Sequence, residues 1–342
     1  MPQIAAGDDF LDMAGVNWIF RHSGAFFLKR SFRNDLLYRS IFEEYVQQLL
    51  LGGHTLEFFI EGTRSRTGKN LPPKVGLLNM ATEPYYQGRL DDMHIQPVAI
   101  GYEKMVEEDN HARQLTGEPR GSFSTKKLLQ ATYEQIIGAS FGRINIQFAA
   151  PIVLSQYVAS FKQSEGVPGD FDPSTVIEHR QSVNRSLARD ILHDFLKESV
   201  VMSTGIVASL VLAYRGGIDK ETLVEKYQWV EQQVILRGGR VDPLQREMSA
   251  LDIVNRALRL LGRGVVAERR SFVEPLVDSR ESHRNILQLG LYRNQLPHVF
   301  FPESLLLITI QSGSANLAED ASFLKVKRGV FFVSFFFFFD KK

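Results

Sequence analysis

Apolar residues in the first 150 positions follow two periods, one typical of helices and one typical of strands. The stretch 36–51 is predicted to be a helix, because Asp35 precedes it, two glycines follow it, and apolar residues recur every four positions. The apolar side expected to face the core carries Leu37, Ile41, Tyr45 and Leu49, with Phe42, Val46 and Leu50 beside them.

Three short apolar runs, at 56–60, 95–102 and 144–148, are typical of buried or half-buried strands. Pro97 should disturb the second strand or place it at an edge, because proline lacks the N–H that a sheet ladder needs. Helices are expected at 73–80 and from Ser124 onward. Strands that alternate with helices predict an α/β fold with a mixed, mostly parallel sheet flanked by helices.

The pattern becomes mainly helical after Pro151. Residues 163–173 are rich in Gly, Pro and Asp, which indicates a loop or linker. Three helical stripes follow: Val183, Leu187, Ile191 and Phe195; Leu223, Tyr227, Val230 and Val234; and Leu244, Met248, Leu251, Leu258 and Leu261. We therefore predict an α/β domain at 1–155 and a mainly helical C-terminal domain at 156–330.

The residues 331–342 stand apart as a phenylalanine-rich tail. Five consecutive phenylalanines, Phe335 to Phe339, fit no helix or strand period and are too few to cross a bilayer. We favour a tail that is not native coding sequence over a membrane-surface anchor flanked by Lys325, Lys327 and Arg328. The apolar run 200–213 is interpreted as a buried core helix rather than a membrane segment.

Charge and cysteine content limit the chemistry. The formal net charge is +1, so no overall field favours nucleic acid as a partner, and any anion site must be local. The absence of cysteine excludes disulfides, thiol nucleophiles and cysteine-based zinc sites. The first residues do not resemble a signal peptide, and the final Asp340-Lys341-Lys342 is not a peroxisomal address.

The strongest chemical feature is the run Glu61-Gly62-Thr63-Arg64-Ser65-Arg66, which directly follows a predicted strand. Ligands bind beyond the carboxyl ends of strands in open α/β sheets, and arginine suits phosphate because its planar fork makes two parallel hydrogen bonds. Gly62 allows a close backbone approach. Glu61 would repel phosphate, so we expect it to hold an arginine or contact a hydroxyl. A solvated basic turn is the alternative.

A second basic segment runs from Gly24 to Arg30 and ends in Lys29-Arg30. Both basic segments follow apolar runs, so we predict that Lys29, Arg30, Arg64 and Arg66 converge on one anion. The histidines add nothing, because none is followed five positions later by an aspartate. His193 has Glu198 at that offset, but a helix-surface pair is the favoured interpretation.

These segments resemble the phosphate acyltransferases of glycerolipid synthesis, a family with four ordered blocks. The second block is similar to Gly24–Arg30, the third to Phe59–Arg66, and the fourth to Gln96-Pro97-Val98-Ala99-Ile100. The extended runs 4–10 and 57–79 are similar to the dihydroxyacetone-phosphate branch, and the mitochondrial-type glycerol-3-phosphate branch comes next. The match extends from residue 3 to about 155 and is diffuse beyond.

The resemblance implies transfer of an acyl group from acyl-coenzyme A to a hydroxyl of dihydroxyacetone phosphate or glycerol 3-phosphate, with no metal or other cofactor. The implied substrate-binding residues are Gly24, Lys29, Arg30, Glu61, Gly62, Thr63, Arg64, Arg66 and Pro97. The resemblance also implies a role in ether-lipid or other phospholipid synthesis, together with a partner enzyme of the ether-lipid pathway. It implies peripheral association with a membrane, at the peroxisome or, as the alternative, at the mitochondrial outer membrane.

The first block, His-x-x-x-x-Asp, supplies the general base in this family and has no counterpart here, so no catalytic residue is assigned. We expect the acyltransferase domain to be N-terminally truncated and the chain to be an inactive fragment. A non-catalytic protein that binds acyl-coenzyme A or a phosphate metabolite is the alternative.

Overall fold

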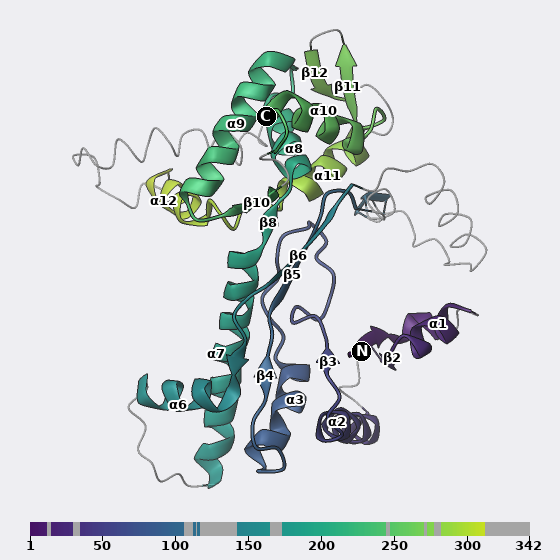
Figure 1. Ribbon diagram of the computed structural model, residues 1–342, viewed down its shortest axis with the longest axis vertical. Helices are drawn as coiled ribbons and strands as arrows, with labels where there is room; N and C mark the ends of the chain where they lie inside the picture. The colour runs from purple at the N-terminus through teal and green to yellow at the C-terminus, as the bar shows by residue number, and fades with distance from the viewer. Residues whose placement is uncertain are drawn as a thin grey trace.

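The computed structural model describes residues 1–11, 15–29, 35–105, 112–113, 115–116, 142–164, 173–243, 247–269, 272–276 and 282–311. The molecule is elongated, with an α/β part at one end and a cluster of helices at the other (Figure 1). Arg30, the helix expected from Ser124 and the phenylalanine-rich tail lie outside the described residues.

A small parallel sheet opens the fold. Strands β1 (Gln3–Gly7), β2 (Ala25–Leu28) and β3 (Leu56–Glu57) lie in the order β2-β1-β3. The 3-10 turn η1 (Asp8–Phe10) and helix α1 (Val16–His22) connect the first two strands, and α2 (Leu36–Leu51) precedes the third. The predicted start of α2 is confirmed, because the Asp35 carboxylate accepts a hydrogen bond of 3.0 Å from the Tyr38 N–H.

The apolar face predicted for α2 is buried only in part. Phe42 and Val46 are buried and pack near Phe26 and Met80. Within the four-residue repeat, Leu49 packs beside this cluster, whereas Leu37, Ile41 and Tyr45 are exposed. The helix carries two adjacent apolar stripes. The sheet covers the stripe that contains Phe42 and Val46, and leaves the stripe that contains Leu37 and Ile41 exposed.

Antiparallel ribbons extend the α/β part. Strand β5 (Val98–Tyr102) pairs with β6 (Ile144–Phe148), and β4 (His94–Ile95) pairs with β7 (Ile152–Val153). The interruption predicted at Pro97 is confirmed, because this proline separates β4 from β5. The strand at 144–148 is also confirmed, but its apolar residues Ile144, Ile146 and Phe148 form the exposed side.

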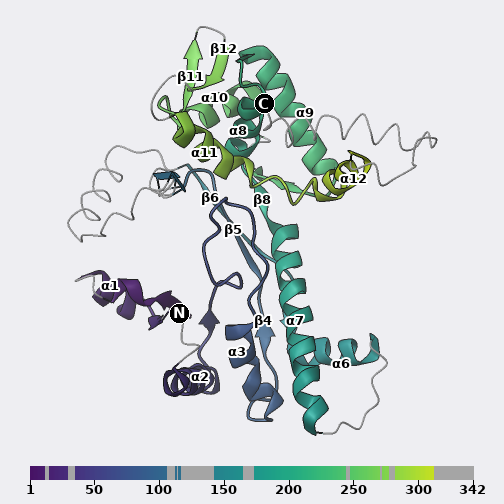
Figure 2. The same ribbon diagram turned by 180° about the vertical axis from the view of Figure 1, so that it is seen from behind.

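Three helices cover these ribbons: α3 (Gly76–Tyr86), α6 (Leu154–Ser164) and α7 (Pro173–Glu198). Their shared core contains Leu78, Leu154, Val183, Leu187 and Ile191. Burial of each large aliphatic side chain contributes roughly 1.5–3 kcal/mol. The helix α7 runs from this layer toward the C-terminal helices, and Figure 2 shows it from the opposite side.

The C-terminal part is mainly helical. Helix α8 (Ser203–Ala213) is buried at the centre of the C-terminal part. It is followed by α9 (Lys220–Leu236), α10 (Ala250–Leu261), α11 (Ser282–Arg293) and α12 (Phe301–Gln311). Short strands complete it: β8 (Val200–Val201), β9 (Ile218–Asp219), β10 (Arg240–Val241), β11 (Val266–Arg269) and β12 (Phe272–Pro275).

The interpretation of 200–213 as a core helix is confirmed, since α8 is buried along nearly its whole length. The stripe from Leu223 to Val234 is buried as predicted, whereas Leu251 and Met248 are exposed. In the part of the chain that the structure describes, no helix is long and apolar enough to cross a membrane.

The predicted fold class is confirmed: this is an α/β fold with a helical C-terminal part. The described strands form several small sheets rather than one large sheet. Because α7 packs against α3 and β5, the helical region begins in close contact with the α/β layer. The boundary at residue 155 stays a prediction.

Candidate functional site

The carboxyl ends of the parallel strands bring Lys29 and the turn at 60–62, which leads into the second basic segment, to one edge of the sheet. Gly7 of β1 pairs with Leu28 of β2, so Asp8 and Lys29 leave the sheet next to each other. On the other side of β1, β3 runs in the same direction and continues into the turn at 60–62. Ligands of α/β proteins bind beyond this edge, which makes it the candidate site.

Lys29 is held against the start of α2. Its Nζ lies 3.3 Å from the Asp35 carboxylate and 4.6 Å from the centre of the Tyr38 ring, and its N–H donates to the Tyr38 hydroxyl. The pKa of Asp35 is lowered, first by the Tyr38 N–H and then by Lys29. About half of each charged side chain stays exposed (52% and 45%), so Lys29 remains accessible to an anion.

Gly24 has a local structural role at the other end of β2. Its φ of 84° is left-handed, and a Cβ there would lie 2.6 Å from the Pro2 carbonyl oxygen. Only glycine therefore allows β1 and the start of β2 to approach this closely.

The turn after β3 is built around Gly62. Its N–H donates to the Phe59 carbonyl, and its φ of 59° is again left-handed. Lys74 returns beside it: the Lys74 N–H donates to the Ile60 carbonyl at 2.8 Å, and a Cβ on Gly62 would lie 3.2 Å from Lys74 Cδ. Lys74 is a cation at this site that the sequence reasoning did not select.

Glu61 closes its own loop. Its carboxylate accepts hydrogen bonds from the Leu71 N–H at 3.0 Å and from the Asn70 amide at 3.4 Å. Within the described residues it forms no ion pair with an arginine, and its expected contact with a substrate hydroxyl stays a prediction. The bonds fix the width of the loop that carries the arginines.

Thr63, Arg64 and Arg66 are exposed in this loop. Its far end rests on α11, because the Asn294 amide donates to the Thr67 carbonyl at 2.5 Å and Gly68 lies against Leu291. Figure 1 shows the chain running from β3 toward the C-terminal helices and returning to α3. The C-terminal part thus helps to position the basic loop, and convergence of Lys29, Arg64 and Arg66 on one anion stays a prediction.

Pro97 is buried between β4 and β5. Its carbonyl accepts from the Ala149 N–H at 3.0 Å and from the Gln96 amide at 3.2 Å. The Ala149 bond joins the two segments that link the antiparallel ribbons, so Pro97 has a structural role in this structure.

A buried charge cluster that the sequence did not reveal joins the two parts of the molecule. Glu103 is 1% exposed and accepts from Arg256 Nε at 3.1 Å, from Arg256 Nη2 at 2.9 Å and from the Arg143 N–H at 2.9 Å. The Arg143 side chain also reaches Asp242 at 3.4 Å. Desolvation by burial pushes the pKa of Glu103 up, but the hydrogen bonds and charges of the arginines outweigh it and the pKa is lowered.

In the part of the chain that the structure describes, neither the histidines nor possible metal ligands form an alternative centre. His298 precedes Glu303 by five positions, but the Glu303 carboxylate is bound by Arg237 Nε at 2.6 Å. Burial lowers the pKa of His298. Among the residues that the structure describes, no group of three or more His, Cys, Asp or Glu side chains could hold a metal ion.

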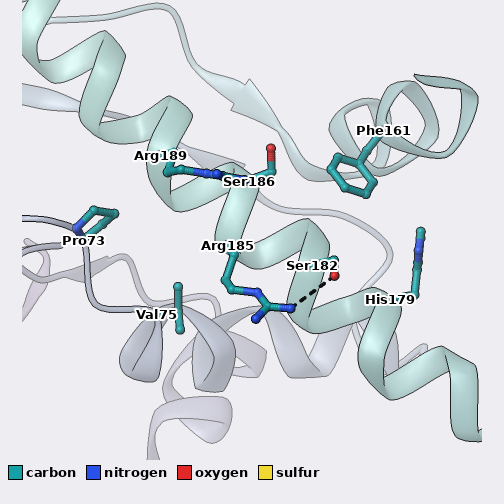
Figure 3. A pocket seen from close by; sticks show the side chains of 8 residues that line it. All are labelled: Pro73, Val75, Phe161, His179, Ser182, Arg185, Ser186 and Arg189. Carbon is teal, nitrogen blue, oxygen red and sulfur yellow. Dashed lines mark hydrogen bonds between the residues drawn. The ribbon is translucent and has the colours of Figure 1, made fainter. Parts of the chain in front are cut away.

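A cavity of about 720 Å³ lies beside α7, as Figure 3 shows. None of the residues predicted to bind substrate lines it, although Pro73 and Val75 in its wall flank Lys74.

Two family profiles match the chain. The one described as the glycerol-3-phosphate acyltransferase C-terminal region matches residues 111–342, and the one described as acyltransferase matches residues 1–101. The two together cover both parts of the fold.

Individual relatives agree with these profiles. The dihydroxyacetone phosphate acyltransferase of Homo sapiens is 32% identical over 98% of this chain and 51% of its own length. The corresponding protein of Oryctolagus cuniculus is 30% identical over 99% of this chain and 51% of its length. A glycerol-3-phosphate acyltransferase of Actinobacillus pleuropneumoniae is 32% identical over 89% of this chain and 36% of its own length. The chain spans about half the length of the curated mammalian relatives it matches.

Proposed function

The chain belongs to the glycerol-3-phosphate acyltransferase family, and we propose on that premise that it serves O-acyl transfer from acyl-coenzyme A to a three-carbon phosphate. The observation that carries the proposal is the position of Lys29 and the Gly62 turn at one edge of the parallel sheet. Dihydroxyacetone phosphate and glycerol 3-phosphate are the two proposed acceptors, as in the names of the relatives.

The basic segments supply the phosphate hold. Arg64 and Arg66 are exposed on a loop that is closed by Glu61 and supported by Asn294. A guanidinium makes two parallel hydrogen bonds to a phosphate, and Lys29 adds a positive charge from the neighbouring strand. Arg30, next to Lys29 in the sequence, completes the proposed set. The phosphate would then fix the acceptor hydroxyl for attack on the thioester.

The hydroxyl must also lose a proton. An alcohol is hardly ionised at neutral pH, and a positioned general base contributes about 10² to 10⁴ in rate. No histidine in residues 1–342 is followed five positions later by an aspartate, which is the pairing that the family uses. We therefore propose that residues 1–342 alone bind substrate but transfer acyl groups slowly. The alternative is a non-catalytic protein that binds acyl-coenzyme A or a phosphate metabolite.

We further propose a peroxisomal, membrane-associated role in ether-lipid synthesis together with another enzyme of that pathway, in line with the named dihydroxyacetone phosphate acyltransferases. The mitochondrial outer membrane is the alternative location. Co-fractionation with peroxisomal rather than mitochondrial marker proteins tests this part.

The reaction itself is tested by comparing residues 1–342 with a form extended at its N-terminus by a segment that carries His-x-x-x-x-Asp. Both are assayed with acyl-coenzyme A and each acceptor, and a third form carries alanine for the added histidine. We expect turnover by the extended form that is at least about 100-fold faster than by the other two. No turnover by any form would favour the binding protein, and equal turnover would show that another residue is the base.

A further inference from the structure

The cavity beside α7 has the chemistry of an anion site. Its lining residues are Pro73, Val75, Phe161, His179, Ser182, Arg185, Ser186 and Arg189. Two of them are arginines, two are serines, and none is acidic. Figure 3 shows Arg185 between the wall of Pro73 and Val75 and the opposite wall of Phe161 and His179.

The two arginines are not neutralised by the fold. In the described part of the chain, Arg185 donates a hydrogen bond to the Ser182 hydroxyl at 3.3 Å, and neither Arg185 nor Arg189 forms an ion pair. Arg180 on the same helix is different, because it lies 3.1 Å from the Glu83 carboxylate.

The acid next to Arg189 is already engaged. The Asp190 carboxylate accepts a short hydrogen bond from the Tyr157 hydroxyl. Positive side chains four positions apart on a helix repel each other, so the pair at 185 and 189 costs stability unless an anion joins it.

Helix geometry sets the span of this anion. Residues four apart lie about 6 Å apart along the axis and on the same side. Ser182 and Ser186 repeat the same spacing, so a row of hydroxyls lies beside the row of guanidinium donors. The Ser182 hydroxyl accepts from Arg185 and the Ser186 hydroxyl is hydrogen-bonded to Tyr157, so the guanidinium groups are the donors for the anion. One phosphate group or two linked phosphates can bridge these donors, whereas Pro73, Val75 and Phe161 offer contact only to apolar groups.

We propose that the α7 cavity binds a phosphate ester with an attached apolar group, at a site separate from the acceptor hold on Lys29 and Arg64. The nucleotide end of an acyl thioester donor and the headgroup of an acidic phospholipid both have this chemistry. The site neighbours the acceptor loop, since the Lys74 N–H, between two of its wall residues, is bonded to the Ile60 carbonyl. Binding at this site requires no turnover, so it is independent of the transfer reaction proposed above.

The test measures binding by the 342-residue protein of coenzyme A, of inorganic phosphate, and of phosphatidylcholine vesicles with and without phosphatidic acid. The test variant is R185Q/R189Q. The matched control is R259Q/R263Q, which also removes two exposed arginines four positions apart, at the end of α10. R64Q reports on the acceptor site.

We expect R185Q/R189Q to bind coenzyme A or the phosphatidic acid vesicles at least about tenfold more weakly, because charge-assisted hydrogen bonds are lost. R259Q/R263Q should bind every probe as the wild type does, and R64Q should keep wild-type binding of coenzyme A and of the vesicles, although it can lose inorganic phosphate at the acceptor site. The thermal midpoint of R185Q/R189Q should be unchanged or slightly raised. The probe whose binding is lost identifies the source of the phosphate. Wild-type affinity of R185Q/R189Q, no binding of any probe by the wild type, or an equal loss in R64Q would overturn the proposal.

Discussion

The substitution Glu103→Gln tests the buried charge cluster that joins β5 and β6 to the C-terminal helices. Glutamine keeps the size of the side chain but removes the charge that Arg256 and Arg143 share. Removing one partner of a fully buried ion pair costs about 3–5 kcal/mol. The two arginine side chains are 28% and 24% exposed, and Arg143 retains Asp242 at 3.4 Å. Water can therefore solvate them in part, and we expect a loss of about 2–3 kcal/mol.

Urea unfolding followed by tryptophan fluorescence measures this loss. Trp229 lies on α9 against the C-terminal core, so its emission reports on the part that the cluster anchors. With a slope of about 2–3 kcal/mol per molar urea, the midpoint should fall by about 1 M. The matched control is Glu268→Gln, because Glu268 forms an exposed ion pair with Lys220 at 3.1 Å and should cost at most about 1 kcal/mol.

A double-mutant cycle decides whether the charge contact is the cause. If Glu103 and Arg256 stabilise the fold through each other, E103Q/R256Q should cost less than the sum of the single substitutions by roughly 0.5–3 kcal/mol. A midpoint for E103Q no lower than that of E268Q, or strict additivity in the cycle, would refute the reasoning.

Two further predictions concern a backbone position and a titrating group. Gly62→Ala should destabilise the protein by about 1–2 kcal/mol and weaken acceptor binding, because the φ of Gly62 is 59°, in the left-handed region, and the new Cβ approaches Lys74. The control Gly88→Ala, at a φ of 71° with open space around the new Cβ, measures the conformational cost alone. Equal effects of the two substitutions on acceptor binding would contradict the argument. Burial lowers the pKa of His298, so the unfolded chain takes up its proton at a higher pH than the folded chain does. The stability due to neutral His298 is therefore present above about pH 6.5 and lost as the pH falls below it. The urea midpoint of His298→Gln should fall less between pH 7.5 and about pH 5.5 than that of the wild type or of the exposed control His54→Gln, and parallel curves would count against this assignment.

Local signals in the sequence were sufficient for the strand ends and the helix cap. An aspartate before an apolar repeat predicted the start of α2, and the structure has that cap at Asp35. The order of apolar runs and basic residues predicted that Lys29 and the Gly62 turn follow strands. Both do, because the parallel register of β1, β2 and β3 brings their carboxyl ends to one edge.

Choices between two sides of one element could not be made from the pattern. The alternation in β6 shows that its two sides differ but not which one is covered, and Ile146 is exposed. The same ambiguity applies to the wide apolar face of α2, where Phe42 and Val46 are buried but Leu37 and Ile41 are exposed. A period identifies the geometry of an element, whereas burial depends on what packs against it.

Contacts between distant positions left no local trace. Glu103 and Arg256 are 153 positions apart, and Thr67 and Asn294 are 227 apart. Neither pair belongs to a repeating pattern, so only the fold reveals that the C-terminal part supports the basic loop. The partners of Glu61 were hidden for a similar reason, since Asn70 and Leu71 reach it only through the path of the loop.

Equilibrium binding of the acceptor is the most direct test of the central claim that the basic loop holds its phosphate. Dihydroxyacetone phosphate and glycerol 3-phosphate are titrated into the 342-residue wild type, into Arg64→Lys and into the control Arg259→Lys. Lysine keeps the charge but cannot make the bidentate contact, so we expect Arg64→Lys to bind about tenfold more weakly and Arg259→Lys to bind as the wild type does. Unchanged affinity of Arg64→Lys for both acceptors would contradict the account.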